Sequence, residues 1–143
     1  MKAQRQKIEH DPSNGIWGDC HRTAIAALFD LDAEDLPHFG DGGPGPDEFN
    51  RRVDAWLALR GLCQVSVPYS CSLADLFSTM VAINKGVFYL LGGRSTIGAN
   101  HTVLCMEDRI VCDPSGNGIV GPLDDGYLWA TFFSPKFGKE TIS

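Results

Sequence analysis

The spacing of apolar residues changes near residue 86, and this change constrains the fold more than any other feature of the sequence. Before that point, apolar residues recur at helical spacing in three segments, 20–29, 46–60 and 72–84. After it, short apolar runs predict strands at 86–91, 101–106, 109–113 and 127–133. A chain that begins with helices and ends with an antiparallel sheet belongs to the α+β class.

Glycine and proline divide these segments. Residues 40–46 consist almost entirely of glycine and proline and can only form a loop, and residues 92–100 form a second, Gly/Ser-rich loop. A brief helical turn at 32–39 and a short strand at 64–69 complete the expected elements. We therefore expect N-terminal helices packed on a C-terminal antiparallel β-sheet.

The length of 143 residues predicts one domain, 1–143, in which the polar residues 1–12 are peripheral. Hydrophobic residues make up 43% of the chain and charged residues 21%, which is enough apolar material for a core without disulfides or a metal. The net charge of −6 repels phosphate backbones, so we expect no nucleic-acid partner.

The N-terminus has a basic start but lacks the apolar region of a secretion signal. No apolar run approaches the roughly 20 residues that a membrane span requires. We therefore expect a cytoplasmic protein with no membrane partner, and the oligomeric state stays open.

The five cysteines are odd in number and form no Cys-x-x-Cys pair. Without a secretion signal, this pattern argues against a disulfide framework, and the missing ligand pairs argue against a structural zinc site. We expect neither a metal nor a cofactor. Cys63, Cys71, Cys105 and Cys112 are interpreted as small apolar residues, whereas Cys20 differs because of its neighbours.

Cys20 is expected at the first position of a helix, with Asp19 or Gly18 as the N-cap. The helix N-terminus and a nearby imidazolium both lower the pKa of a thiol, so we interpret Cys20 as a nucleophile. Its own N–H would face a developing oxyanion, and Asn14 is the candidate for a second donor. The alternative for Asn14 is a residue of an Asn-Gly turn.

His101 is the histidine best placed to act as a base, because it alone begins a strongly apolar strand. His21 follows Cys20 directly and would point about 100° away from it on a helix. The alternative for His101 is a buried, hydrogen-bonded histidine, and the presence of Cys20 favours the catalytic interpretation.

Asp113 ends the next strand and is the candidate that orients His101. A two-residue turn between the strands would put the two side chains on opposite faces of the sheet. A three-residue loop around Asp108 would pair Val103 with Asp113 and place Asp113 and His101 on one face, within reach of each other. The catalytic interpretation therefore predicts the three-residue loop, and the alternative for Asp113 is a turn-opening residue.

Four further residues are candidates for substrate contacts. Trp17 and Gly18 precede the nucleophile, and Gly93 and Asn100 lie in the loop before His101. Exposed backbone at Gly92, Gly93 or Gly98 would pair with an extended peptide. Trp17 would line a substrate pocket or, as the alternative, serve only for packing.

Three short motifs resemble those of the papain-like cysteine peptidases. They are Gly-Asp-Cys-His-Arg-Thr-Ala-Ile-Ala-Ala-Leu at 18–28, Asn-His-Thr-Val-Leu at 100–104 and Cys-Asp-Pro-Ser-Gly at 112–116. The compact group that includes the C39-type bacteriocin-processing peptidases is the most similar branch. The resemblance covers the chain from about residue 13 to residue 116. Small stand-alone proteins of this kind also occur among bacteriophage sequences.

The resemblance implies a papain-like fold in which Cys20 is the nucleophile, His101 the base and Asp113 the orienting acid. The family usually has glutamine where this chain has Asn14, and often glycine where it has His21. It also implies a protein or peptide substrate.

The leading hypothesis is a thiol-dependent hydrolase, a peptidase, isopeptidase or amidase, that works through a Cys-His-Asp triad and a thioester. The same site could instead transfer the acyl group to an amine or deamidate glutamine. A hypothesis of another class is a papain-like binding or inhibitory module, such as a phage would encode, that captures a host protein without turnover. A weaker third hypothesis is a cell-wall amidase of a related group.

Overall fold

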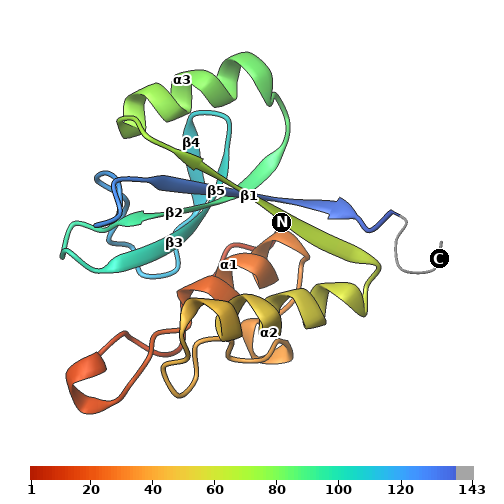
Figure 1. Cartoon of the computed structure of the whole chain (residues 1–143), viewed down its shortest axis with the longest axis vertical. Coiled ribbons are helices and arrows are strands. Elements are labelled where there is room, and N and C mark those ends of the chain that lie inside the picture. The colour runs from red at the N-terminus through yellow and green to blue at the C-terminus, as the bar shows by residue number, and fades with distance from the viewer. Residues whose placement is uncertain (138–143) are drawn as a thin grey trace.

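The two apolar periodicities correspond to helices and strands in the computed structural model, which describes residues 1–137 (Figure 1). In this part of the chain three α-helices and one five-stranded antiparallel sheet confirm the α+β class. The elements are η1 Pro12–Asn14, α1 Cys20–Leu28, η2 Ala33–Asp35, α2 Pro46–Ala58, β1 Leu62–Tyr69, α3 Leu73–Ile83, β2 Phe88–Arg94, β3 Asn100–Met106, β4 Arg109–Cys112 and β5 Leu128–Pro135.

The strands are arranged in the order β1-β5-β2-β3-β4. The β2–β3 and β3–β4 pairs are formed by neighbours in sequence, whereas β1 pairs with the distant β5 from Leu62 opposite Pro135 to Tyr69 opposite Leu128. The first strand of the chain is therefore joined to the last one, and α3 lies between β1 and the remaining strands in sequence.

Helices cover both faces of the sheet. Figure 1 shows α3 on one face and α1 with α2 on the other. Side chains of a strand alternate between faces, so Leu104 of β3 packs in the core with α1 and α2, whereas Val103 and Cys105 pack in the core with α3. This alternation decides which residues of β3 face the start of α1.

The helix ends follow from local sequence. Ser72 precedes α3, and its hydroxyl oxygen accepts a hydrogen bond from the N–H of Asp75 at 3.1 Å. Pro46 occupies the first turn of α2, where its missing N–H leaves no bond unmade. Among residues 1–137, no helix combines the length and the apolar composition that crossing a bilayer requires.

The N-terminal segment, residues 2–8, lies on the surface but is bonded more closely than a peripheral segment would be. The N–H of Lys2 donates to the carbonyl of Ala27 in α1 at 2.8 Å, and the N–H of Gln6 donates to the carbonyl of Pro114 at 2.9 Å. The thiol of Cys112 at the end of β4 lies 3.4 Å from the carbonyl oxygen of Gln4. The segment thus connects the helical layer to the end of β4.

Candidate active site

Cys20 is the first residue of α1, as the sequence predicts, and Asp19 occupies the N-cap position. The carboxylate of Asp19 makes no cap bond to the helix. One of its oxygens accepts from the N–H groups of Lys7 and Ile8, at 3.1 and 3.0 Å, and the other accepts from Arg22 at 2.9 Å. Buried Asp19 therefore fixes the N-terminal segment against the start of α1.

The environment of the Cys20 thiol contradicts the expected lowering of its pKa. Cys20 is half-buried, and the burial of its thiol raises the pKa, with a smaller contribution from the negative charge of Asp19. Hydrogen bonds from the backbone and side chain of Thr102 act in the opposite direction but do not outweigh burial. Position at a helix start is thus insufficient to make this thiol a resting thiolate.

His101 and Asp113 form the interaction that the sequence predicts. Nε2 of His101 lies 2.7 Å from Oδ1 of Asp113, and only 6% of the histidine surface is exposed. A carboxylate can only accept, so Nε2 carries the proton and Nδ1 is left as an acceptor. No hydrogen bond to Nδ1 occurs among the described residues.

Asp113 is also the turn residue that the alternative interpretation expects. Its carboxylate accepts from the N–H of Gly116 at 3.0 Å and from that of Gly118 at 2.7 Å. Partial burial acts to raise the pKa of Asp113, but the hydrogen bonds from His101, Gly118 and Gly116 hold it below its ordinary value. One carboxylate therefore organises the loop and orients the imidazole.

The hairpin between β3 and β4 reaches this arrangement by a route that differs from the prediction. The turn has two residues, because Met106 pairs with Arg109, so the predicted three-residue loop is wrong. The register then shifts by one residue, and Leu104 pairs with Cys112. This β-bulge contains the extra residue Val111 and returns Asp113 to the face of His101.

Ser115 is a member of the site that the sequence analysis does not identify. Its hydroxyl oxygen lies 2.9 Å from Nε2 of His101 and accepts from the N–H of Asn117 at 3.1 Å. The side chain therefore adds a second contact on the nitrogen that Asp113 holds. The Asp-Pro-Ser-Gly motif is the only sequence signal that could have pointed to it.

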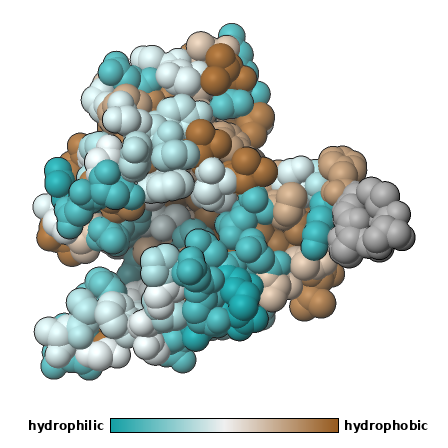
Figure 2. All heavy atoms as spheres, in the orientation of Figure 1, coloured by the Kyte–Doolittle hydropathy of each residue, from teal (hydrophilic) through white to brown (hydrophobic). Residues whose placement is uncertain are grey.

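Cys20 and His101 both line one cleft of about 1230 Å³. Figure 2 shows the surface hollowed between the part that contains the sheet and α3 and the part that contains η1 and α2. No hydrogen bond joins Cys20 to His101 among the described residues. The partner of the thiol is Thr102, whose side chain leaves β3 on the opposite face from that of His101.

His21 also contacts Thr102. Its Nδ1 lies 3.2 Å from the Thr102 hydroxyl, and its ring meets Phe49 edge-on with 5.0 Å between the centroids. Burial lowers the pKa of His21 to about 4, so the ring is uncharged at neutral pH. As predicted, the His21 ring does not contact the Cys20 thiol. It contacts Thr102, which in turn contacts the thiol.

Asn14 does not occupy the predicted oxyanion position. It ends η1, which projects from the molecule in Figure 1, and its amide donates to Asp11 at 2.8 Å. Asn14 is exposed and does not line the cleft, whereas Gln6 does. The Gln6 amide nitrogen donates to the carbonyl of Ile8 at 2.8 Å, and its Oε1 is buried with no partner among the described residues. Gln6 lies 14 positions before Cys20, so no local motif in the sequence indicates that its side chain reaches the cleft.

Trp17, Gly18 and Asn100 line the cleft as predicted. Trp17 also packs closely over Gly43, where an added Cβ would lie 2.4 Å from the indole ring, so the packing interpretation is confirmed and a contact with substrate stays a prediction.

Gly93 is wrongly predicted as a substrate contact. It lies within β2, opposite His101, and does not line the cleft. A Cβ at this position would lie 2.7 Å from Cγ2 of Ile119 and 2.9 Å from the carbonyl oxygen of Gly121. The absence of a side chain at Gly93 therefore serves close packing.

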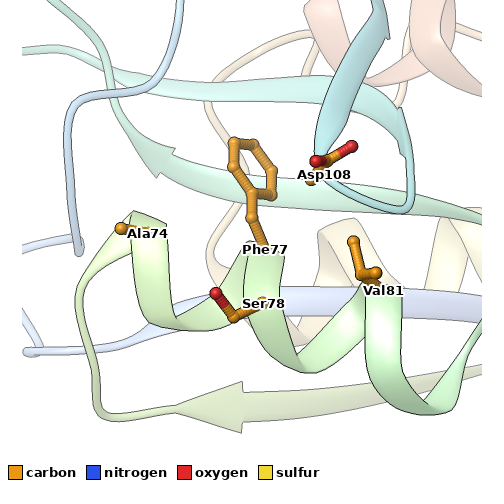
Figure 3. A pocket seen from close by; sticks show the side chains of 5 residues that line it. All are labelled: Ala74, Phe77, Ser78, Val81 and Asp108. Carbon is orange, nitrogen blue, oxygen red and sulfur yellow. The ribbon is translucent and has the colours of Figure 1, made fainter.

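A second hollow of about 490 Å³ lies beside α3. Figure 3 shows Phe77 extending from α3 toward the β3–β4 turn, where Asp108 lies. The lining of this hollow contains no thiol or imidazole. Among the described residues as a whole, no group of three or more side chains is arranged to hold a metal. Cys20, His21 and His101 all line the larger cleft instead.

No family model matches the chain, and neither a curated protein nor a solved structure matches it significantly. The resemblance to papain-like cysteine peptidases therefore rests on the motifs quoted above and stays a prediction.

Proposed function

We propose that the protein is a papain-like thiol-dependent hydrolase that cleaves an amide bond of a protein or peptide substrate. The observation that carries the proposal is the His101–Asp113 pair. Asp113 holds the imidazole through Nε2, Nδ1 has no partner among the described residues, and His101 and Cys20 line the same cleft. A base oriented in this way is what a cysteine nucleophile requires.

The raised pKa of Cys20 determines how the first step proceeds. The thiol is protonated at neutral pH, so its proton must move to Nδ1 of His101 as sulfur attacks the substrate carbonyl carbon. The Cys20 side chain contacts Thr102 in this structure, so the proposal requires it to turn toward His101 when substrate binds. The carboxylate of Asp113 then stabilises the imidazolium that forms.

The remaining steps follow from the same groups. The oxyanion faces the N–H of Cys20, which has no acceptor within the helix because it occupies the first position of α1. His101 protonates the leaving amine, the C–N bond breaks, and a thioester on Cys20 remains. Water hydrolyses the thioester, whereas attack by an amine would give acyl transfer, and a glutamine side chain as substrate would give deamidation.

The test is mass spectrometry after incubation with peptides, isopeptides and glutamine-containing substrates. We expect an acyl adduct on Cys20 and cleaved product with the wild type. Cys20→Ala would form neither, and His101→Asn would form them at least about a hundredfold more slowly. If the wild type yields no Cys20 adduct and no product from any substrate class, the proposal fails.

A binding module is the second candidate, and one observation favours it. The protonated Cys20 contacts Thr102 and not His101, as would be expected of an idle site. A module of this kind would bind its partner equally well as wild type and as Cys20→Ala, with no covalent intermediate in either. For both candidate functions we propose the cytoplasmic location that the sequence leads us to expect.

A further inference from the structure

Arg5 is the only lysine or arginine among the described residues that line the cleft. Its guanidinium makes no hydrogen bond or ion pair within residues 1–137. By contrast, Arg22, Arg51 and Arg52 are each held by a carboxylate, at 2.9, 2.7 and 2.9 Å. Arg60, Arg94 and Arg109 also lack a carboxylate partner within residues 1–137, so the feature that singles out exposed Arg5 is its position at the cleft.

The backbone on either side of Arg5 is fixed in place. The carbonyl of Gln4 accepts from the thiol of Cys112, and the N–H of Gln6 donates to the carbonyl of Pro114. The guanidinium lies directly over Gly116, where an added Cβ would be 2.2 Å from Nη1. Arg5 is therefore held against the loop that carries Asp113.

This loop connects Arg5 to the proposed base. Gly116 donates to Asp113, and the preceding Ser115 contacts Nε2 of His101. The guanidinium thus lies against Gly116, in the loop whose residues Asp113 and Ser115 contact the imidazole.

The charges around Arg5 leave it free to bind an anion. The carboxylates that line the cleft are those of Glu9 and Asp125. Glu9 forms no ion pair with Arg5, and Asp125 accepts from the indole N–H of Trp129 and the N–H of Tyr127, both at 2.8 Å. An arginine without a carboxylate partner presents its full set of donors to a ligand.

We propose that Arg5 binds a carboxylate of the substrate on the leaving-group side of the scissile bond, an inference that rests on the proposed function. His101 delivers a proton to the leaving amine, so that part of the substrate lies on the His101 side of the cleft, where Arg5 is. A guanidinium matches a carboxylate in a two-bond geometry. The carboxylate comes from the chain terminus of the substrate or from an aspartate or glutamate side chain.

The test uses binding and needs no turnover. In a Cys20→Ala background, affinity selection would be run with two pools of random hexapeptides that are identical except for a free or an amidated C-terminus. Retained peptides are identified by mass spectrometry. Enrichment of the free-carboxylate pool reports the chain terminus, and enrichment of aspartate and glutamate over asparagine and glutamine reports the side chain.

Three variants make the test specific to Arg5. Arg5→Gln removes the charge, and Arg5→Lys keeps it. Lys7→Gln removes one charge from the same segment outside the cleft, where Lys7 pairs with Glu34 at 3.6 Å.

We expect at least about fivefold enrichment of carboxylate-bearing peptides, as a charge-assisted hydrogen bond provides. Arg5→Gln would abolish this enrichment, Lys7→Gln would keep it, and Arg5→Lys would keep part of it. Equal retention of neutral and anionic peptides, no retention, or an unchanged preference in Arg5→Gln would each overturn the inference.

The results also separate this inference from the proposed function. Anionic peptides that bind but are never cleaved by the wild type would reject the hydrolase and support the carboxylate subsite. Cleavage by the wild type with no preference for carboxylate-bearing peptides would support the hydrolase and reject the carboxylate subsite.

Discussion

At the scale of single residues, competing environments decide the chemistry of Cys20. A helix N-terminus favours a thiolate by roughly 0.3–1 kcal/mol at a partly exposed site. Loss of hydration on burial disfavours the thiolate and raises the pKa of Cys20 above its ordinary value. The position of a cysteine in a helix therefore indicates where a nucleophile is, but not its resting protonation state.

The pKa of His21 predicts how stability depends on pH. Its folded-state value of about 4 lies below the ordinary value of 6.5, so the unfolded chain binds more protons between these pH values. Stability is therefore fully present above about pH 6.5 and falls as the pH is lowered toward 4. The loss from His21 is at most about 3 kcal/mol, and less to the extent that cleft water screens the ring. Urea unfolding between pH 7 and pH 4 measures it.

His21→Asn tests the origin of this dependence, since asparagine can still reach the Thr102 hydroxyl but does not titrate. We expect a smaller fall in stability with pH in this variant than in the wild type. Proton NMR titration of His21 in the folded protein gives an independent measurement. A midpoint near 6.5 would contradict the predicted shift.

At the scale of elements, the β-bulge at Val111 decides whether His101 and Asp113 meet. A regular two-residue hairpin would place them on opposite faces, because side chains alternate along each strand. The extra residue reverses that alternation for the end of β4 alone. The site thus depends on an irregularity in the hairpin and not on the length of its turn.

Gly93 and its neighbour Gly92 give a matched pair of predictions at this scale. Gly93→Ala would place a methyl group 2.7 Å from Ile119 and 2.9 Å from the backbone of Gly121, so we expect destabilisation of about 1–3 kcal/mol. At Gly92 the nearest atom, Cβ of Trp129, is 3.7 Å away, which is ordinary contact. Gly92→Ala should therefore change the free energy of unfolding by less than about 1 kcal/mol. Denaturant unfolding compares the two, and equal losses would reject the packing explanation for Gly93.

At the scale of the whole molecule, the N-terminal segment connects parts that are distant in sequence. It bonds to α1, to the carboxylate of Asp19 and to Pro114, which follows β4. Through Asp19 it reaches the start of α1, and through Pro114 it reaches the loop that contains Asp113. One short segment therefore joins the two halves of the proposed site.

Deleting residues 1–8 should lower the free energy of unfolding by several kcal/mol, because each lost hydrogen bond contributes about 1 kcal/mol and Asp19 loses buried partners. Deleting only residues 1–3 keeps the bonds to Asp19 and Pro114 and should have a smaller effect. Urea unfolding of both truncated chains measures the difference. Wild-type stability in the chain without residues 1–8 would show that the segment is peripheral after all.

The sequence by itself determined the elements and their class, because helix and strand periodicity, caps and turn residues act over a few neighbouring positions. It placed Cys20 at the start of α1 and His101 near the start of β3, and both positions are confirmed. It also identified the pairing of His101 with Asp113, although by the wrong hairpin geometry.

The tertiary structure decided what depends on contacts between distant segments. It joined β1 to β5, brought Gln6 to the cleft in place of Asn14, and set the environment of Cys20. The pKa of the thiol depends on burial and on Thr102, which is far from Cys20 in sequence. Local patterns contain no information about such contacts, so the members of the candidate site could be proposed from the sequence, but their protonation and their partners could not.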